Sequence, residues 1–223
     1  RPPPISTLFP TTTLFRSLAE IEDYYRNDAA LSPGLKRRIM GEIELARSFL
    51  CFNDLPKMHA GHLKAHELLD GSSAIANKEM LFSFGSPHML YLYHREKGRL
   101  RWFVEYSAGV FPVYCEVANG CGAGFEHLVW AEYYLETGDL AQAELYARKA
   151  IYKAETMVQF AMIICANLTL ARLYLAQDRR EEALGVIDGL AAEAAAYDDP
   201  IFNSTFDLCA GYKIGRASCR GRV

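Results

Sequence analysis

The sequence predicts an all-α fold built from antiparallel helical hairpins that repeat about every 40 residues. Apolar side chains recur at the three- and four-residue spacing of an amphipathic helix through most of the 223-residue chain. Residues that cap helices stand directly before prolines, and residue types match at positions forty apart. Strand signals are weak, because the β-rich stretch at residues 89–93 is short and lies between helix-capping signals.

Four segments show the helical spacing most clearly, and capping and turn residues separate them. Ser32, Ser86 and Asp199 each precede a proline, an order that suits the first turn of a helix. Gly98 and Gly138 lie where a helix should end, since glycine accepts the left-handed conformation found there. The four segments are residues 42–52, 126–135, 142–154 and 166–176.

The repeat emerges when the sequence is shifted along itself. A shift of 40 residues pairs Ala131 with Ala171, and a shift of 85, close to two repeats, relates Ala131 to Ala46. Small residues at these positions would let the first helix of a hairpin approach the second closely, and an aromatic residue three positions later would fill the adjacent space. A divergent repeat is expected at residues 87–118. The predicted repeat-packing residues are Ala46, Phe49, Ala131, Tyr134, Gly138, Ala143, Ala171, Tyr174 and Ala183.

The pattern is typical of tetratricopeptide (TPR)-like repeats, whose hairpins stack into an α-solenoid and bury one another's faces. Gly138 would end one helix of a hairpin, and the carboxylate of Asp139 would cap the next. The alternative is an ordinary helical bundle in which the forty-residue echo arises by chance.

Charge is distributed unevenly along the chain. The 24 basic and 27 acidic residues give a formal net charge of −3, yet every acidic residue lies within residues 20–207. Six basic residues lie outside that range, and without them 18 basic residues face 27 acidic ones, a balance of −9. An acidic body of this kind should repel DNA, so no direct nucleic-acid contact is expected.

Both ends resemble translated sequencing-adapter sequence. Residues 7–17 (TLFPTTTLFRS) agree with one adapter strand at ten of eleven positions, and residues 214–223 (IGRASCRGRV) agree with the opposite strand at nine of ten. The alternative is a basic N-terminal arm and a basic C-terminal tail. We expect adapter-derived segments at 1–17 and 213–223, and between them, at 18–212, a TPR-like repeat domain from a longer protein.

Other features favour a cytoplasmic protein that is not an enzyme. The six cysteines are irregularly spaced and form no C-x-x-C pair, which fits a reducing compartment and predicts no zinc site. No uncharged apolar run reaches the roughly 18 residues that a membrane-spanning helix needs. The sequence lacks a phosphate loop and a nucleophile elbow, so neither catalysis nor a cofactor is expected of these residues.

Five short segments resemble, in order and spacing, the central helical-repeat region of large MalT-like, LuxR-type bacterial transcriptional regulators. They are GEIEL at 41–45, FGSPHMLYLYHRE at 84–96, GCGAG at 120–124, RKA at 148–150 and LAR at 170–172. The resemblance implies a signal-sensing and oligomerisation segment that binds a small-molecule inducer or a regulatory protein and can self-associate. ATP and DNA would then bind to an upstream ATPase module and a downstream helix-turn-helix, outside this sequence.

An aromatic-rich stretch is the candidate surface for the ligand or partner. Tyrosine and tryptophan combine apolar area with a polar group, and arginine supplies hydrogen-bond donors. The alternative is that these rings pack between divergent hairpins. The candidate residues are Tyr91, Tyr93, His94, Arg95, Arg101, Trp102 and Tyr106.

Two weaker hypotheses concern a set of histidines and a cluster of glycines. His59, His62 and His66 share one helical face, so a helical metalloenzyme is a remote alternative, although packing between helices is the more common role and no metal site is predicted. The glycines within residues 120–124 lack the lysine and hydroxyl of a phosphate loop and predict a tight corner instead. The main alternative function is a stand-alone TPR-like scaffold for protein–protein contacts.

Overall fold

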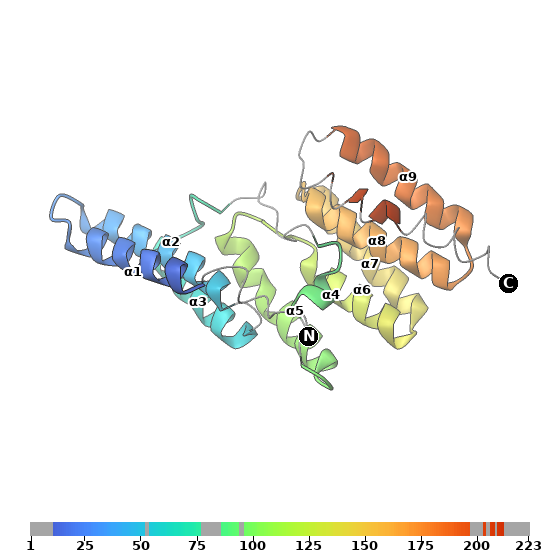
Figure 1. Cartoon of the computed structure of the whole chain (residues 1–223), viewed down its shortest axis with the longest axis horizontal. Helices are drawn as coiled ribbons and strands as arrows, with labels where there is room; N and C mark the ends of the chain where they lie inside the picture. The colour runs from blue at the N-terminus through green and yellow to red at the C-terminus, as the bar shows by residue number, and fades with distance from the viewer. Residues whose placement is uncertain are drawn as a thin grey trace. The chain divides into compact units, whose positions relative to one another are not determined.

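Every regular element among the residues that the structure describes is a helix, which confirms the all-α class for that part of the chain (Figure 1). The computed structural model describes residues 11–51, 54–76, 86–93, 96–196, 203, 206–207 and 209–211. The predicted cap at Asp199, most of the segment 1–17 and all of 213–223 lie outside these residues. No helix in the described ranges is both long enough and apolar enough to cross a membrane.

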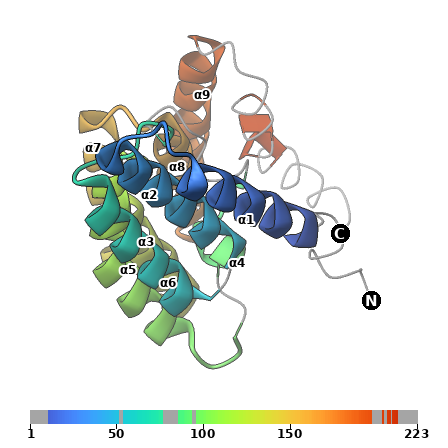
Figure 2. The same ribbon diagram turned by 90° about the vertical axis from the view of Figure 1, so that its left-hand side faces the viewer.

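The chain divides into two compact units, and the first consists of residues 1–77 and 113–119. Its helices lie side by side (Figure 1, Figure 2), and two of them begin with a capping side chain. The Ser32 hydroxyl accepts a hydrogen bond from the Leu35 N–H at 3.3 Å, and the Asp54 carboxylate accepts one from the Lys57 N–H at 3.2 Å. The helices are α1 (Thr11–Asn27), which starts within the adapter-like segment, α2 (Pro33–Leu50) and α3 (Leu55–Leu69).

Close packing between α2 and α3 depends on glycines and not on Ala46, so the packing role predicted for Ala46 is wrong. A Cβ atom on Gly41 would lie 2.7 Å from Leu69 Cγ, and one on Gly61 would lie 2.8 Å from Ser48 Cβ. Ala46 is exposed, because it lies roughly 150° around α2 from the face that Gly41 and Ser48 share. Phe49, which is half-buried, does pack on an aromatic ring, that of Tyr114.

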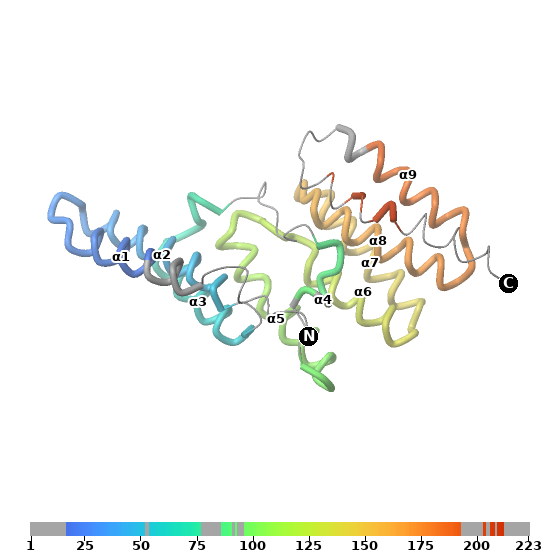
Figure 3. Tube along the Cα trace, in the orientation of Figure 1, coloured from blue at the N-terminus to red at the C-terminus, as the bar shows by residue number. Residues whose placement is uncertain are grey.

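The second unit consists of residues 78–112 and 120–223, and four of its helices follow one another as packed neighbours. Figure 3 traces the chain through these helices, and α6 also contacts α8, the next helix but one. The helices thus contact alternate as well as consecutive neighbours. The helices are α4 (Met89–Tyr93), α5 (Leu100–Val117, of which residues 100–112 belong here), α6 (Phe125–Thr137), α7 (Leu140–Thr156), α8 (Phe160–Ala176) and α9 (Arg180–Ala196).

Alanines make up five of the nine residues of one core cluster in the second unit. Five of the residues expected at helix contacts lie in a single buried cluster, and half-buried Tyr134 packs against it. Alanine at a contact lets helix axes approach closely, and the larger tyrosine fills the space at the edge of that contact. The five are Ala131, Ala143, Ala171, Tyr174 and Ala183.

The backbone of the turns repeats with the same period as the sequence. Gly98, Gly138 and Asp178 are forty residues apart, and all three adopt the left-handed conformation, with φ of 80°, 88° and 59°. Each precedes a helix: α5 begins at residue 100, α7 at 140 and α9 at 180. Asp139 caps α7 by accepting a hydrogen bond from the Gln142 N–H at 3.2 Å.

The corner at residues 120–124 brings two backbones together. A Cβ atom on Gly124, whose φ is +103°, would lie 2.8 Å from the carbonyl oxygen of Ala150 on α7. The Gly122 N–H donates a hydrogen bond to Gln159 Oε1 at 2.7 Å, which ties the corner to the start of α8. This segment therefore serves as the close turn that its glycines predict.

Candidate functional site

Three of the seven candidate surface residues lie on α5, within the second unit. Arg101, Trp102 and Tyr106 project from its first two turns. Tyr91 and Tyr93 belong to the short helix α4, but their side chains are outside the described set, as are His94 and Arg95 altogether. Of the seven candidates, the structure therefore describes the side chains of the three on α5.

The α5 residues form a small stacked group. Trp102 and Tyr106 are one turn apart, and their rings stack with centroids 5.2 Å apart and planes 25° apart. The guanidinium carbon of Arg99 lies 3.9 Å from the Trp102 ring centroid. Arg101 forms an ion pair with Glu105 at 2.8 Å, and this hydrogen bond raises the pKa of Arg101. Trp102 remains 37% exposed.

A second aromatic group lies on α6 and α7. The rings of Trp130 and Tyr134 stack with centroids 5.5 Å apart, and Tyr133 meets Trp130 edge-on at 5.7 Å. Tyr146 of α7 lies 5.5 Å from Tyr134, and the ammonium of Lys149 lies 4.8 Å from the Tyr146 ring centroid. All four aromatic residues are half-buried, and Tyr134 and Tyr146 pack against the alanine-rich core cluster.

Both groups belong to the second unit, one on α5 and the other on α6 and α7. We call the six rings the aromatic surface, and they include both tryptophans of the chain. Sequence analysis missed Trp130, Tyr133 and Tyr146, and assigned Tyr134 to packing alone, because the ring contacts between α6 and α7 depend on the tertiary structure. The aromatic surface consists of Trp102, Tyr106, Trp130, Tyr133, Tyr134 and Tyr146.

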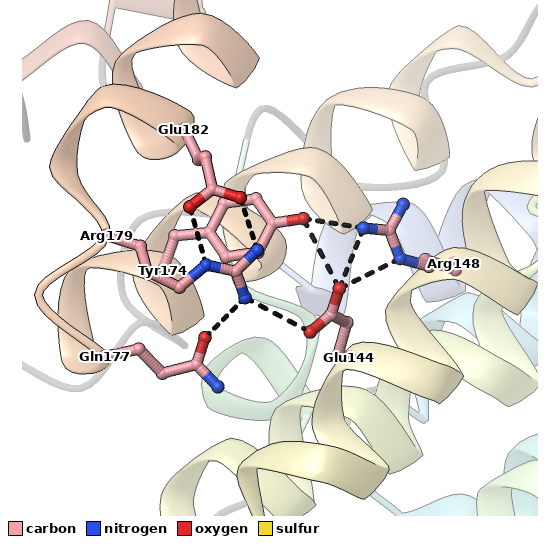
Figure 4. Close-up of polar contacts among 6 residues, drawn as sticks. All are labelled: Glu144, Arg148, Tyr174, Gln177, Arg179 and Glu182. Carbon is pink, nitrogen blue, oxygen red and sulfur yellow. Dashed lines mark hydrogen bonds and ion pairs between the residues drawn. The ribbon is translucent and has the colours of Figure 1, made fainter.

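A polar network joins α7, α8 and α9 (Figure 4). Arg148 Nη2 donates to the Tyr174 hydroxyl at 2.7 Å and to Glu144 Oε1 at 2.8 Å. The guanidinium carbon of Arg179 lies 4.2 Å from the Tyr174 ring centroid, and its Nη1 atom lies 3.5 Å from Glu144 Oε2. Arg179 also donates a hydrogen bond to Glu182, which raises the pKa of Arg179. Each arginine already has a carboxylate partner, so the network holds neighbouring helices together and offers no reactive group.

A buried carboxylate holds α4 in place. Glu132 of α6 is only 1% exposed, and its two oxygens accept hydrogen bonds from the Met89 and Leu90 N–H groups at 3.0 and 2.5 Å. Burial raises the pKa of Glu132 to about 7, against the opposing effect of these two N–H groups and of Arg172. Glu132 thus acts as a cap supplied from another helix, a role that no local sequence pattern could reveal.

Arg172 completes this network from α8. It pairs with Glu136 at 2.7 Å and lies 3.3 Å from His88 Nδ1. Burial and the charge of Arg172 lower the pKa of His88 to about 4. The start of α4 is therefore fixed by charged groups from both α6 and α8.

The histidine helix α3 does not assemble a metal site in the structure. His62 is 6% exposed and lies 4.9 Å, ring to ring, from Tyr114, whereas His66 points to Glu116 at 3.4 Å. In the part of the chain that the structure describes, no group of three or more histidine, cysteine or acidic side chains is placed to hold a metal ion. Burial lowers the pKa of His62 to about 4, so it is neutral at pH 7.

Comparison with known proteins identifies no family for this chain. No protein-family model, curated protein or solved structure matches the chain. The evidence for function therefore lies in the arrangement of the chain's own residues. Among these arrangements, the aromatic surface is the one most suited to binding.

Proposed function

We propose that residues 18–212 form a TPR-like helical-repeat domain, the signal-sensing and oligomerisation segment of a LuxR-type transcriptional regulator. Its aromatic surface binds a small-molecule inducer or a regulatory protein. The observation that carries this proposal is the presence of two groups of partly exposed rings in the second unit, one on α5 and one on α6 and α7, which together include both tryptophans of the chain. Rings with this mixture of apolar area and polar edge are enriched where proteins bind ligands and partners.

The arrangement of α6 to α9 supports the repeat part of the proposal. Two hairpins of similar length follow each other, their turns share left-handed residues forty apart, and α6 contacts α8. In helical-repeat proteins each hairpin contacts only its neighbours, and first helices of successive hairpins lie together. The earlier pair α4–α5 begins its second helix in the same register, at residue 100.

The regulator context comes from the sequence resemblance. Under this proposal the chain itself is not an enzyme and uses no cofactor, and it acts in the cytoplasm. ATP and DNA are bound by modules of the parent protein upstream and downstream. The same aromatic surface would also serve a stand-alone scaffold for protein–protein contacts, so the neighbouring sequence decides between the two functions.

The genomic reading frame is the first test. We expect native sequence to replace residues 1–17 and 213–223 and to encode a phosphate-loop ATPase upstream and a helix-turn-helix downstream. A frame that contains neither module would overturn the regulator assignment and favour the scaffold.

The second test addresses binding directly. Thermal-shift measurements of the chain with a metabolite panel should find a compound that raises Tm, because a ligand that binds only the folded state stabilises it. Trp102→Ala should abolish the shift. The matched control is Tyr152→Ala, since Tyr152 is 74% exposed on α7 but lies roughly 120° around that helix from Tyr146. Equal loss in both variants would contradict binding at the aromatic surface.

A further inference from the structure

We infer that α5 contains a hinge, the helical turn from Ala108 to Pro112, at which the helix bends in the folded protein. This bending is a property of the helix itself and does not depend on a ligand of the aromatic surface. Among the helices that the structure describes, α5 is the one whose residues divide between the two compact units, and the division falls directly after Pro112.

Buried aromatic side chains anchor α5 on both sides of this division. Phe111 is buried in the second unit, and its ring centroid lies 4.6 Å from that of Phe125. Three residues later, Tyr114 is buried in the first unit, and its ring centroid lies 4.9 Å from that of His62 on α3. The helix is therefore held by a different unit before and after Pro112, so bending is concentrated between these two anchors.

Pro112 weakens the helix at this point. It lies inside α5, and because proline has no N–H, the α-helical hydrogen bond to the Ala108 carbonyl cannot form. The proline ring also crowds that carbonyl, which is why sharp helix kinks occur mostly at prolines. Pro112 is exposed, so its side chain fills no space in a core that would require a proline here.

Gly109 loosens the same turn. A Cβ atom on Gly109 would meet nothing within 4 Å, so packing does not require a glycine there, whereas one on Gly41 would lie 2.7 Å from Leu69 Cγ. A glycine inside a helix leaves the backbone more conformational freedom than an alanine would. Two residues that weaken a helix, neither of them required by packing, therefore lie together where α5 passes from one unit to the other.

The test measures distances along α5 in the full chain. Spin-label amino acids replace Arg101 and Glu116, whose side chains are each 71% exposed, and a straight helix would hold these positions about 22 Å apart along its axis. Double electron–electron resonance should give a broad distribution of distances that contracts to a single narrow peak in Gly109→Ala/Pro112→Ala. Amide hydrogen exchange at residues 113–116 should slow at least about tenfold in that variant, because alanines restore the helical bond and stiffen the backbone.

Gly185→Ala is the matched control, because Gly185 also lies in open space inside a helix, α9, and its replacement should leave both measurements on α5 unchanged. Gly109→Ala alone should narrow the distribution in part, so the test does not depend on the proline substitution. If the wild-type turn already gives the narrow peak, or exchange at residues 113–116 is equal in both proteins, α5 is rigid and the hinge is rejected. Equal narrowing in Gly185→Ala would indicate a general gain in stability and would also reject it.

Discussion

His62 makes the stability of the first unit depend on pH, and its replacement by phenylalanine tests the reasoning. The imidazole is buried against Tyr114, and its Nε2 atom has no hydrogen-bond partner among the described residues. Protonation would place a charge at this site with nothing to stabilise it. His62→Phe keeps a flat ring beside Tyr114 and removes the titratable group.

The magnitude follows from the pKa of His62. Burial, and to a smaller extent nearby His59, lowers it from 6.5 to about 4 in the folded protein. Between these values the unfolded chain binds the proton and the folded chain does not, so the free energy of unfolding falls as pH falls. A difference of one in pKa between the folded and unfolded states corresponds to about 1.4 kcal/mol, so the difference from 6.5 to about 4 changes the free energy of unfolding by about 3 kcal/mol. The contribution is complete above pH 6.5 and is lost as pH falls towards 4.

Urea unfolding followed by circular dichroism measures the effect at several pH values from 7 down to about 4. Amide hydrogen exchange within α3 assigns it to the first unit, where His62 lies. We expect the stability of His62→Phe relative to wild type to increase by about 3 kcal/mol over this range. His66→Gln is the control: its side chain is 42% exposed, and its replacement should change stability by less than about 1 kcal/mol.

The comparison of variants isolates His62, because Glu132 and other groups titrate equally in both proteins. A relative stability that stays constant between pH 7 and 4 would refute the argument, since it would mean that His62 keeps an ordinary pKa in the folded state. A change of the opposite sign would show that the folded protein stabilises the imidazolium.

Three further predictions concern stability and use urea unfolding as the measurement. Glu132→Ala should cost about 2–5 kcal/mol, because two buried N–H groups at the start of α4 lose their acceptors; a loss below 1 kcal/mol would contradict this. Since burial raises the pKa of Glu132 to about 7, its contribution should weaken as pH rises from 4.5 through 7. Gly124→Ala should destabilise by about 1–3 kcal/mol through its clash with α7 and its positive φ, whereas Gly185→Ala, in open space on α9, should stabilise by about 0.5–1 kcal/mol. Asp139→Ala should cost about 1 kcal/mol by removing the α7 cap, and an unchanged midpoint would argue against that bond.

Local sequence determined the helices and where they begin and end. Ser32 and Asp139 cap helices as their positions predict, because a cap needs only the side chain and the next few backbone amides. The forty-residue spacing likewise reappears in the turns at Gly98 and Gly138, since a left-handed turn is a property of a single residue.

The tertiary structure alone decided which faces meet. The sequence repeat placed Ala46 in a helix contact, but the crossing of α2 and α3 uses Gly41 instead, because a helix rotation of one residue moves a side chain by about 100°. In the same way, only the packing of α6 on α7 brings Tyr134 against Tyr146, and only burial turns Glu132 into a cap for α4. Helix periodicity acts over a few residues, whereas the binding surface and the buried charge depend on contacts between residues tens of positions apart.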